Sequence, residues 1–313
     1  MNRLALLPGQ IAALVEDVCE LDVRAFKPGN VSFASPGHGM TAAHFVRSAK
    51  AIAEPLTRDG ATVGERILDS VTATRAAVQC NTNLGIILLL APLVQAALRP
   101  VPITGLRARL EPILRGLSVD DAEKAFTAIR LAAPGGLGES TQHDVRGPAS
   151  ADLGTAMQHA AGHDQIARQY ATGYESVFDF GVPLAELALR RHEGENWAAV
   201  DVFLGLLGQW PDTHIVRKHG LEIANAVCLE ARRIRAKFVA TSPEAAMPLL
   251  LDLDASLKNR GINPGTSADL TVTIFVAVRL QEALDKIATD PPANLAGGIC
   301  PPRAFAREFH QPL

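Results

Sequence analysis

The chain has 313 residues, of which 48% are hydrophobic and 20% are charged, and its formal net charge is -3. This mild acidity excludes the basic surface that proteins use to hold nucleic acids or anionic membranes. Four scattered cysteines, with no paired spacing and no histidine partner, predict reduced thiols and a cytoplasmic protein. The length allows a large buried core.

The distribution of apolar residues predicts an all-α fold. Aromatic residues make up only 5% of the chain, and apolar residues recur at helical spacing, as in 11–18. The most apolar run, 84–98, contains Pro92 and is too short to span a membrane, so we expect a buried helix. The periodicity predicts one compact helical domain over 1–290 and an irregular, Pro-rich tail over 291–313.

The first predicted helix ends at a polar turn, Lys27-Pro28-Gly29-Asn30. Pro28 and Gly29 break the helix, and the turn presents the cation of Lys27 and the amide of Asn30. Such a turn suits the recognition of a phosphate or a nucleotide, but it also suits an ordinary helix stop. Similar turns at later helix ends favour the first interpretation.

A second polar turn, Asn81-Thr82-Asn83, precedes the most apolar helix. Asn81 is predicted to be its N-cap, and the free N–H groups and positive dipole end of a helix N-terminus suit an anionic ligand. Gly85 would allow that ligand to approach closely. The same residues can also form a plain cap without a ligand.

Two segments in the middle of the chain carry further polar groups. The longest internal loop, 134–148, is rich in glycine and contains Asp144, and loops of this kind often hold binding groups. Farther along, Tyr170 and Tyr174 are the only tyrosines of the chain and fall close together. Their clustering indicates the polar wall of a pocket.

A short helix is expected after residue 212, with Asp212 as its cap and with Arg217 and Lys218 near its end. Two adjacent cations suit a polyphosphate, because an arginine can hold phosphate oxygens in a bidentate way. Cations at a helix C-terminus also stabilise the helix dipole without any ligand. Both interpretations remain open.

The last long helix is expected to open at Pro264 and Gly265, with Thr266 or Ser267 as its cap and Asp269 in its first turn. A first-turn aspartate complements the helix dipole. It can also hold Mg²⁺, which commonly binds one or two carboxylates together with the phosphates of a substrate.

These turns occur together in the order and at the separations typical of one family. Over about residues 10–285 the chain resembles the triphosphoribosyl-dephospho-CoA synthase family. The resemblance implies an all-helical fold, ATP as the ribosyl donor, Mg²⁺, release of adenine and 3′-dephospho-CoA as the acceptor, in prosthetic-group biosynthesis. It depends on four segments: 27–31, 81–85, 211–213 and 264–269.

The resemblance implies roles for the polar residues of these turns. The residues expected to neutralise phosphates are Lys27, Arg217 and Lys218. Asp212 and Asp269 are expected to hold magnesium, and together with Asp144 to act catalytically by stabilising the positive charge that develops on the ribose. The remaining expected nucleotide contacts are Gly29, Asn30, Asn81, Asn83, Gly265 and Ser267.

One departure from the family pattern implies an alternative. Asn83 and Leu84 stand where the family usually carries a histidine and a basic residue, and this form resembles a branch found in methane-forming archaea and C1-metabolising bacteria. That likeness implies a role in making a C1-carrier cofactor of the methanopterin or methanofuran type, as an enzyme with another acceptor or as a non-catalytic binding subunit. The expected partners are ATP and a small-molecule acceptor, and a homo-oligomer or a biosynthetic partner protein is left open.

Overall fold

The computed structural model describes residues 5–103, 105–138, 140 and 142–289. Within these residues the chain forms fourteen α-helices and one π-helical turn, η1, and no β-sheet, so the all-α prediction is confirmed. The predicted tail, 291–313, lies outside the described residues. The helices are α1 Pro8–Arg24, α2 Ala42–Thr57, α3 Val63–Val78, α4 Leu84–Leu98, α5 Leu106–Arg115, α6 Val119–Ala132, α7 Leu153–Ala160, α8 Gln165–Thr172, η1 Ser176–Gly181, α9 Val182–Arg191, α10 Glu195–Gln209, α11 Thr213–His219, α12 Leu221–Ala240, α13 Pro243–Asn259 and α14 Gly265–Thr289.

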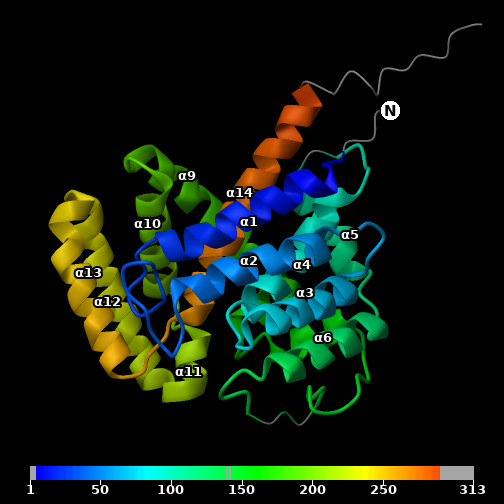
Figure 1. The fold of residues 1–313 in the computed structure, drawn as a ribbon, viewed down its shortest axis with the longest axis horizontal. Helices are drawn as coiled ribbons and strands as arrows, with labels where there is room; N and C mark the ends of the chain where they lie inside the picture. Colours follow the sequence, from blue (N-terminus) through cyan, green and yellow to red (C-terminus); the bar gives the residue numbers. More distant parts are fainter. Residues whose placement is uncertain (1–4, 104, 139, 141, 290–313) are drawn as a thin grey trace, which may run out of the picture.

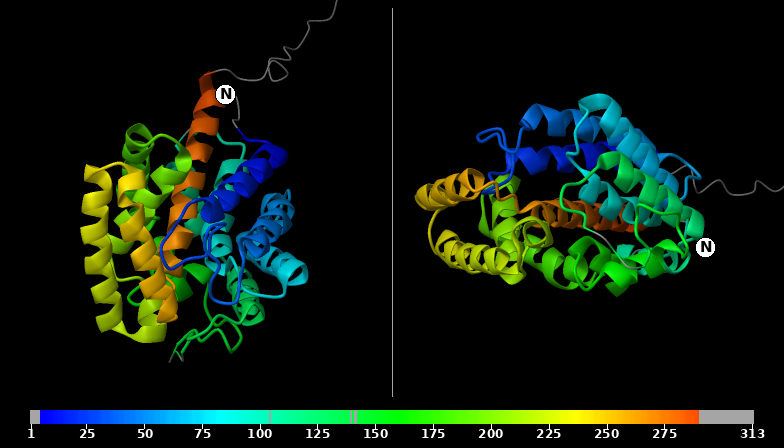
Figure 2. Two further views of the ribbon diagram at one scale, coloured as in Figure 1. Left: turned by 60° about the vertical axis from the view of Figure 1, so that its left-hand side comes forward. Right: turned by 90° about the horizontal axis from the view of Figure 1, so that it is seen from below.

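The longest helix, α14, forms the centre of the molecule. It packs against α1 and α4 on one side and against α9 and α10 on the other. In Figure 1 α1 crosses in front of α14, and the helices α9, α10, α12 and α13 lie to the left of α14. The left-hand view of Figure 2 separates the two groups, with α1 and α2 on one side of α14 and α12 and α13 on the other. The side chains of 270–278 are all buried, because this stretch of α14 contacts neighbours all round.

The apolar run expected to form a buried helix is α4. Pro92 stands inside it, and a proline lacks the N–H that would bind the carbonyl four residues earlier, at Leu88. The Tyr170 hydroxyl donates a hydrogen bond to this carbonyl at 2.5 Å, and the Tyr174 hydroxyl donates to the Leu89 carbonyl at 2.9 Å. Both tyrosines are buried. The prediction that they form a polar pocket wall is therefore wrong, because their hydroxyls bind backbone carbonyls of the proline-containing helix α4.

Within the described residues, none of the helices combines the length and the apolar character that crossing a membrane requires.

Candidate active site

The polar helix ends predicted from the sequence meet around one cavity of about 670 Å³. This volume is in the usual range of small-molecule sites. The starts of α4 and α14, the end of α11, the loops after α1 and α6, and helices α6 to α8 supply its wall. Eight of the predicted site residues line it: Asn30, Asn81, Asn83, Asp144, Arg217, Lys218, Gly265 and Asp269.

Four predicted site residues do not line the cavity: Lys27, Gly29, Asp212 and Ser267. Each of them instead makes contacts that position residues of the cavity wall, and these contacts are described below. Their distribution separates the groups that can reach a ligand from those that position them.

The turn after α1 is locked onto α13. The Gly29 N–H donates to Asp254 Oδ1 at 2.8 Å, and the His38 ring contacts the Gly29 carbonyl at 2.8 Å. Gly29 has φ +81°, and a Cβ at this position would lie 2.8 Å from carbons of Leu257 and Pro264. Only glycine fits both the backbone angle and the space, so its part here is structural.

Lys27 forms a buried ion pair with Asp22 of α1. Its Nζ lies 2.7 Å from Asp22 Oδ1 and also donates to the Asp22 carbonyl, and its side chain is fully buried. The structure gives its ammonium group a carboxylate partner away from solvent rather than a place on the cavity wall. Asp22, in contrast, does line the cavity.

Asp269 lies just after the first turn of α14, and not within it as the sequence predicted, and its side chain approaches the start of α4. A Cβ on Gly85 would overlap Asp269 Oδ2 and lie 2.8 Å from the Ile166 side chain, so glycine is required for this close approach. Burial raises the pKa of Asp269 well above its usual range, and the carboxylates of Asp22 and Asp212 raise it further. A cation bound beside the Asp269 carboxyl would favour its ionised form and so counteract this rise of the pKa.

Asp212 joins two helix N-termini with one carboxylate. Its Oδ1 accepts the N–H groups of His214 and Ile215 at 2.9 and 3.1 Å, which caps α11 as predicted. Its Oδ2 accepts the N–H and the hydroxyl of Ser267 at 2.7 and 2.8 Å. The first turn of α14 is therefore capped by Asp212 from another element, and not by its own Thr266 or Ser267 as the sequence predicted.

Arg217 and Lys218 stand in the last turn of α11 and face the loop that follows α6. The Arg217 Nε donates to the Gly135 carbonyl at 3.3 Å, and its guanidinium lies 3.6 Å from Asp164 Oδ2. Partial burial and the charge of Arg217 lower the pKa of Lys218. Two cations are thus held side by side at the cavity, where an anionic ligand would offset their mutual repulsion.

Sequence reasoning missed His214, which lines the cavity between Gly265 and the two cations. Burial lowers its pKa to about 3, and the charges of Lys218 and Arg217 contribute. The imidazole is therefore neutral at physiological pH and can accept a hydrogen bond. No pattern of spacing in the sequence distinguishes this histidine from the other residues of α11.

Asp144 organises the loop in which it lies. Its carboxylate accepts the N–H of Ser140 at 2.9 Å and pairs with the Arg146 guanidinium at 2.8 Å. The side chain of Arg146 lowers the pKa of Asp144, and the N–H of Ser140 adds to the effect. These contacts show that this carboxylate stabilises the loop, and the catalytic role of Asp144 stays a prediction.

Asn81 and Asn83 shape the start of α4 in a way that differs from the predicted cap. The helix begins at Leu84 with Asn83 as its N-cap residue, and Asn81 Oδ1 accepts the Leu84 N–H at 3.2 Å. The Asn83 side chain accepts a hydrogen bond from the Thr74 hydroxyl at 3.1 Å. Both asparagines line the cavity, so the amide group of Asn81 or Asn83 can also meet a ligand.

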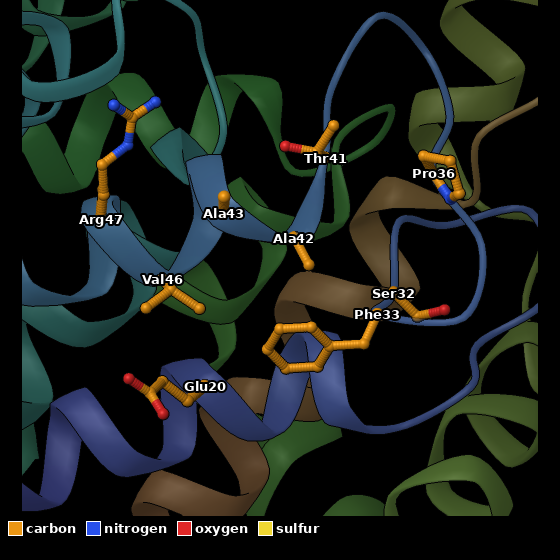
Figure 3. Close-up of a pocket in the computed structure, with 9 residues that line it drawn as sticks. All are labelled: Glu20, Ser32, Phe33, Pro36, Thr41, Ala42, Ala43, Val46 and Arg47. Atoms are coloured by element: carbon orange, nitrogen blue, oxygen red, sulfur yellow. The ribbon is translucent and has the colours of Figure 1, made fainter.

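A second, shallow hollow lies between α1, the loop after it and α2 (Figure 3). The Phe33 ring lies across it beside Ala42 and Val46, and Glu20 and Arg47 stand on the α1 and α2 sides. Phe33 is 63% exposed. The hollow contains one carboxylate and one guanidinium and none of the predicted site residues, so we do not assign the chemistry to it.

The donor set of the main cavity fits Mg²⁺ together with phosphates. Among the described residues no group of three or more His, Cys, Asp or Glu side chains forms a metal cage. Asp22 and Asp269 nevertheless face the same cavity and interact electrostatically. Magnesium usually binds through one or two carboxylates, with water and substrate phosphates completing its coordination.

Comparisons with known proteins agree with this architecture. A solved structure from Archaeoglobus fulgidus, a provisionally named triphosphoribosyl-dephospho-CoA synthase, is similar with a TM-score of 0.57 and 24% identity, covering 76% of this chain and 98% of that one. At this identity the likeness establishes the fold. No curated protein matches the chain. The sequence model of the CitG family, ATP:dephospho-CoA triphosphoribosyl transferase, matches residues 8–287, so the chain belongs to this family of transferases.

Proposed function

We propose that the protein transfers the triphosphoribosyl group of ATP to the hydroxyl of an acceptor such as 3′-dephospho-CoA, with Mg²⁺ and with release of adenine. Membership of the family supports the reaction class. The observation that carries the assignment is the pairing, in one cavity, of two cations from α11 with two carboxylates from α1 and α14. This arrangement suits a triphosphate on one side and a metal ion on the other.

In the proposed reaction the cations and the carboxylates of the cavity have different roles. Arg217 and Lys218 hold the triphosphate, and Asp22 and Asp269 would hold Mg²⁺, which would neutralise phosphate charge when it is bound. The bond between C1′ and the adenine nitrogen breaks while the oxygen of the acceptor hydroxyl bonds to C1′, and the proton that this hydroxyl loses balances the proton that the leaving adenine gains. The fixed carboxylates stabilise the positive charge that develops on the ribose.

The direct test is to incubate the protein with ATP, Mg²⁺ and 3′-dephospho-CoA and to follow free adenine by chromatography. We expect adenine and the triphosphoribosylated acceptor to accumulate in equal amounts. If the protein neither binds ATP nor releases adenine, the proposed function is wrong.

One observation favours the alternative acceptor. Asn83 and Leu84, the residues that depart from the pattern of the resembled family, both line the cavity. The change therefore falls where it can alter recognition of the acceptor. Repeating the assay with a pterin or furan precursor of a C1 carrier tests this alternative, and turnover with that acceptor alone would replace 3′-dephospho-CoA in the proposal.

We predict that Arg217→Ala and Lys218→Ala each weaken the binding of Mg²⁺-bound inorganic tripolyphosphate about 10- to 100-fold, because each removes a charged hydrogen-bond donor from the anion. Isothermal titration calorimetry measures the effect, which should shrink at high salt. Arg233→Ala, which removes an exposed cation from α12, is the matched control and should change nothing. Equal weakening by all three variants would contradict a specific phosphate site.

We also predict that Mg²⁺ binds more tightly as the pH rises through the raised pKa of Asp269. Only the ionised carboxylate binds the metal, so a proton must leave when Mg²⁺ binds. Calorimetry in two buffers of different ionisation enthalpy should reveal this proton release. The same experiment on Asp269→Asn should show no release from this group, whereas unchanged release would exclude Asp269 as a ligand.

A further inference from the structure

One part of the cavity wall consists of apolar side chains of α6 and α7. These are Phe126, Ile129, Leu153, Ala156 and Met157, and all of them line the same cavity as Arg217 and Asp269. Phe126, Leu153, Ala156 and Met157 are otherwise buried in the protein. The wall here offers flat contact area and little charge, unlike the wall near α11 and α14.

Two histidines stand beside this apolar wall. The rings of His143 and His159 meet edge to face, with centroids 5.7 Å apart and planes at 82°. His143 has φ +52°, a left-handed backbone conformation that is uncommon for a residue other than glycine and that often marks a functional position. The Ser150 hydroxyl contacts its ring nitrogen at 3.3 Å. Both imidazoles line the cavity.

The loop after α6 connects this apolar region with the cations. At its start, Gly135 and Gly136 lie against the side chains of Arg217 and Lys218. Farther along, Leu137 and His143 line the cavity, and Leu137 is 43% exposed. A single ligand with an anionic chain and a flat, apolar head could therefore lie along the loop from one region to the other.

We infer that the apolar region between α6 and α7 is a subsite for a planar heteroaromatic ring, stacked on the apolar wall and flanked by His143 and His159. This inference rests on the proposed function and adds the position of the ring. The ring can come from two sources, the adenine of the ATP donor or the ring system of the acceptor. Stacking of a base on apolar and aromatic side chains suits either source.

The inference can be tested by placing a large side chain from α7 in the subsite. Ala160 lines the cavity, whereas Gln158 on the same helix is exposed and does not. We expect Ala160→Phe to weaken binding of a ring-bearing ligand about 10- to 100-fold, the range that stacking provides, and we expect Gln158→Phe to have no effect. The probes are Mg²⁺-bound ATP, adenosine, 3′-dephospho-CoA and Mg²⁺-bound inorganic tripolyphosphate, each measured by calorimetry.

A second variant avoids any disturbance of the core. His159 is exposed, so His159→Ala removes one ring edge without opening a buried cavity. We expect it to weaken the same ring-bearing ligand about three- to tenfold, as the loss of one aromatic contact does. Tripolyphosphate has no ring, so neither variant should change its affinity.

The outcomes separate the sources. If the variants bind ATP and adenosine more weakly and tripolyphosphate as tightly as the wild type does, the adenine of the donor occupies the subsite. If they bind 3′-dephospho-CoA more weakly and ATP as tightly as the wild type does, the ring of the acceptor occupies it. If Ala160→Phe and His159→Ala change none of the ring-bearing ligands, or weaken tripolyphosphate equally, the inference is wrong. A wild-type protein that binds neither ATP nor tripolyphosphate would instead count against the proposed function.

Discussion

Asp269→Asn should lower the rate of adenine release about 10²- to 10³-fold while leaving the protein folded, because it removes the charge that we propose to act on the reacting centre. Steady-state assays at saturating Mg²⁺ measure this loss. Asp285→Asn is the matched control, since it makes the same change at an exposed position of the same helix. It should keep the wild-type rate.

The same variant should be more stable than the wild type when Mg²⁺ is absent. Because the pKa of Asp269 is raised in the folded protein, folding is favoured by protonation, and this contribution is lost as the pH rises through the raised pKa. An amide avoids the loss. We expect the Tm at pH 8 to rise by about 2–4 °C for each kcal/mol regained. A lower Tm would show that the Asp269 carboxylate stabilises the fold instead.

Lys27→Met should destabilise the protein by about 3–5 kcal/mol, because it leaves the buried Asp22 carboxylate without its partner. Urea unfolding measures this cost. Adding Asp22→Asn should recover most of the lost stability, since both charges are then removed. Lys50→Met, at a 60% exposed lysine that lies 3.9 Å from Glu16, should cost less than about 1 kcal/mol.

The stabilities of the Lys27 and Asp22 single and double variants distinguish two roles for Lys27, a structural ion pair and a phosphate contact. If the double variant is as unstable as Lys27→Met alone, the two side chains are not coupled and the buried ion pair does not explain the position. If Lys27→Met keeps its stability and loses only tripolyphosphate binding, the lysine acts on phosphate as the sequence predicted.

Helix content and the places where helices end could be predicted because they depend on local pattern. Residues close together in the sequence determine the apolar stripe of α1, the apolar run of α4 and the cap at Asp212. The convergence of these ends could be expected only through resemblance to a family. Their meeting in space depends on α14, which brings segments from the whole chain together.

The direction in which each polar side chain points could not be predicted in the same way. Lys27 and Asn30 are three residues apart in one turn, yet the lysine faces the core and the asparagine faces the cavity. Asp22 was overlooked, although a signal existed. It follows Val15, Val18 and Cys19 at helical spacing, so a carboxylate stands on the buried face of α1. An ionisable group on an apolar helix face needs a partner, which here is Lys27.

Asp212 has a consequence for selectivity. By capping the first turns of α11 and α14 with one carboxylate, it links the two helices that carry Arg217 and Asp269. The distance between the proposed phosphate-binding cations and the proposed Mg²⁺-binding carboxylates is then fixed by the fold. We expect this fixed distance to favour ATP over ADP and AMP, because a shorter phosphate chain would not span it.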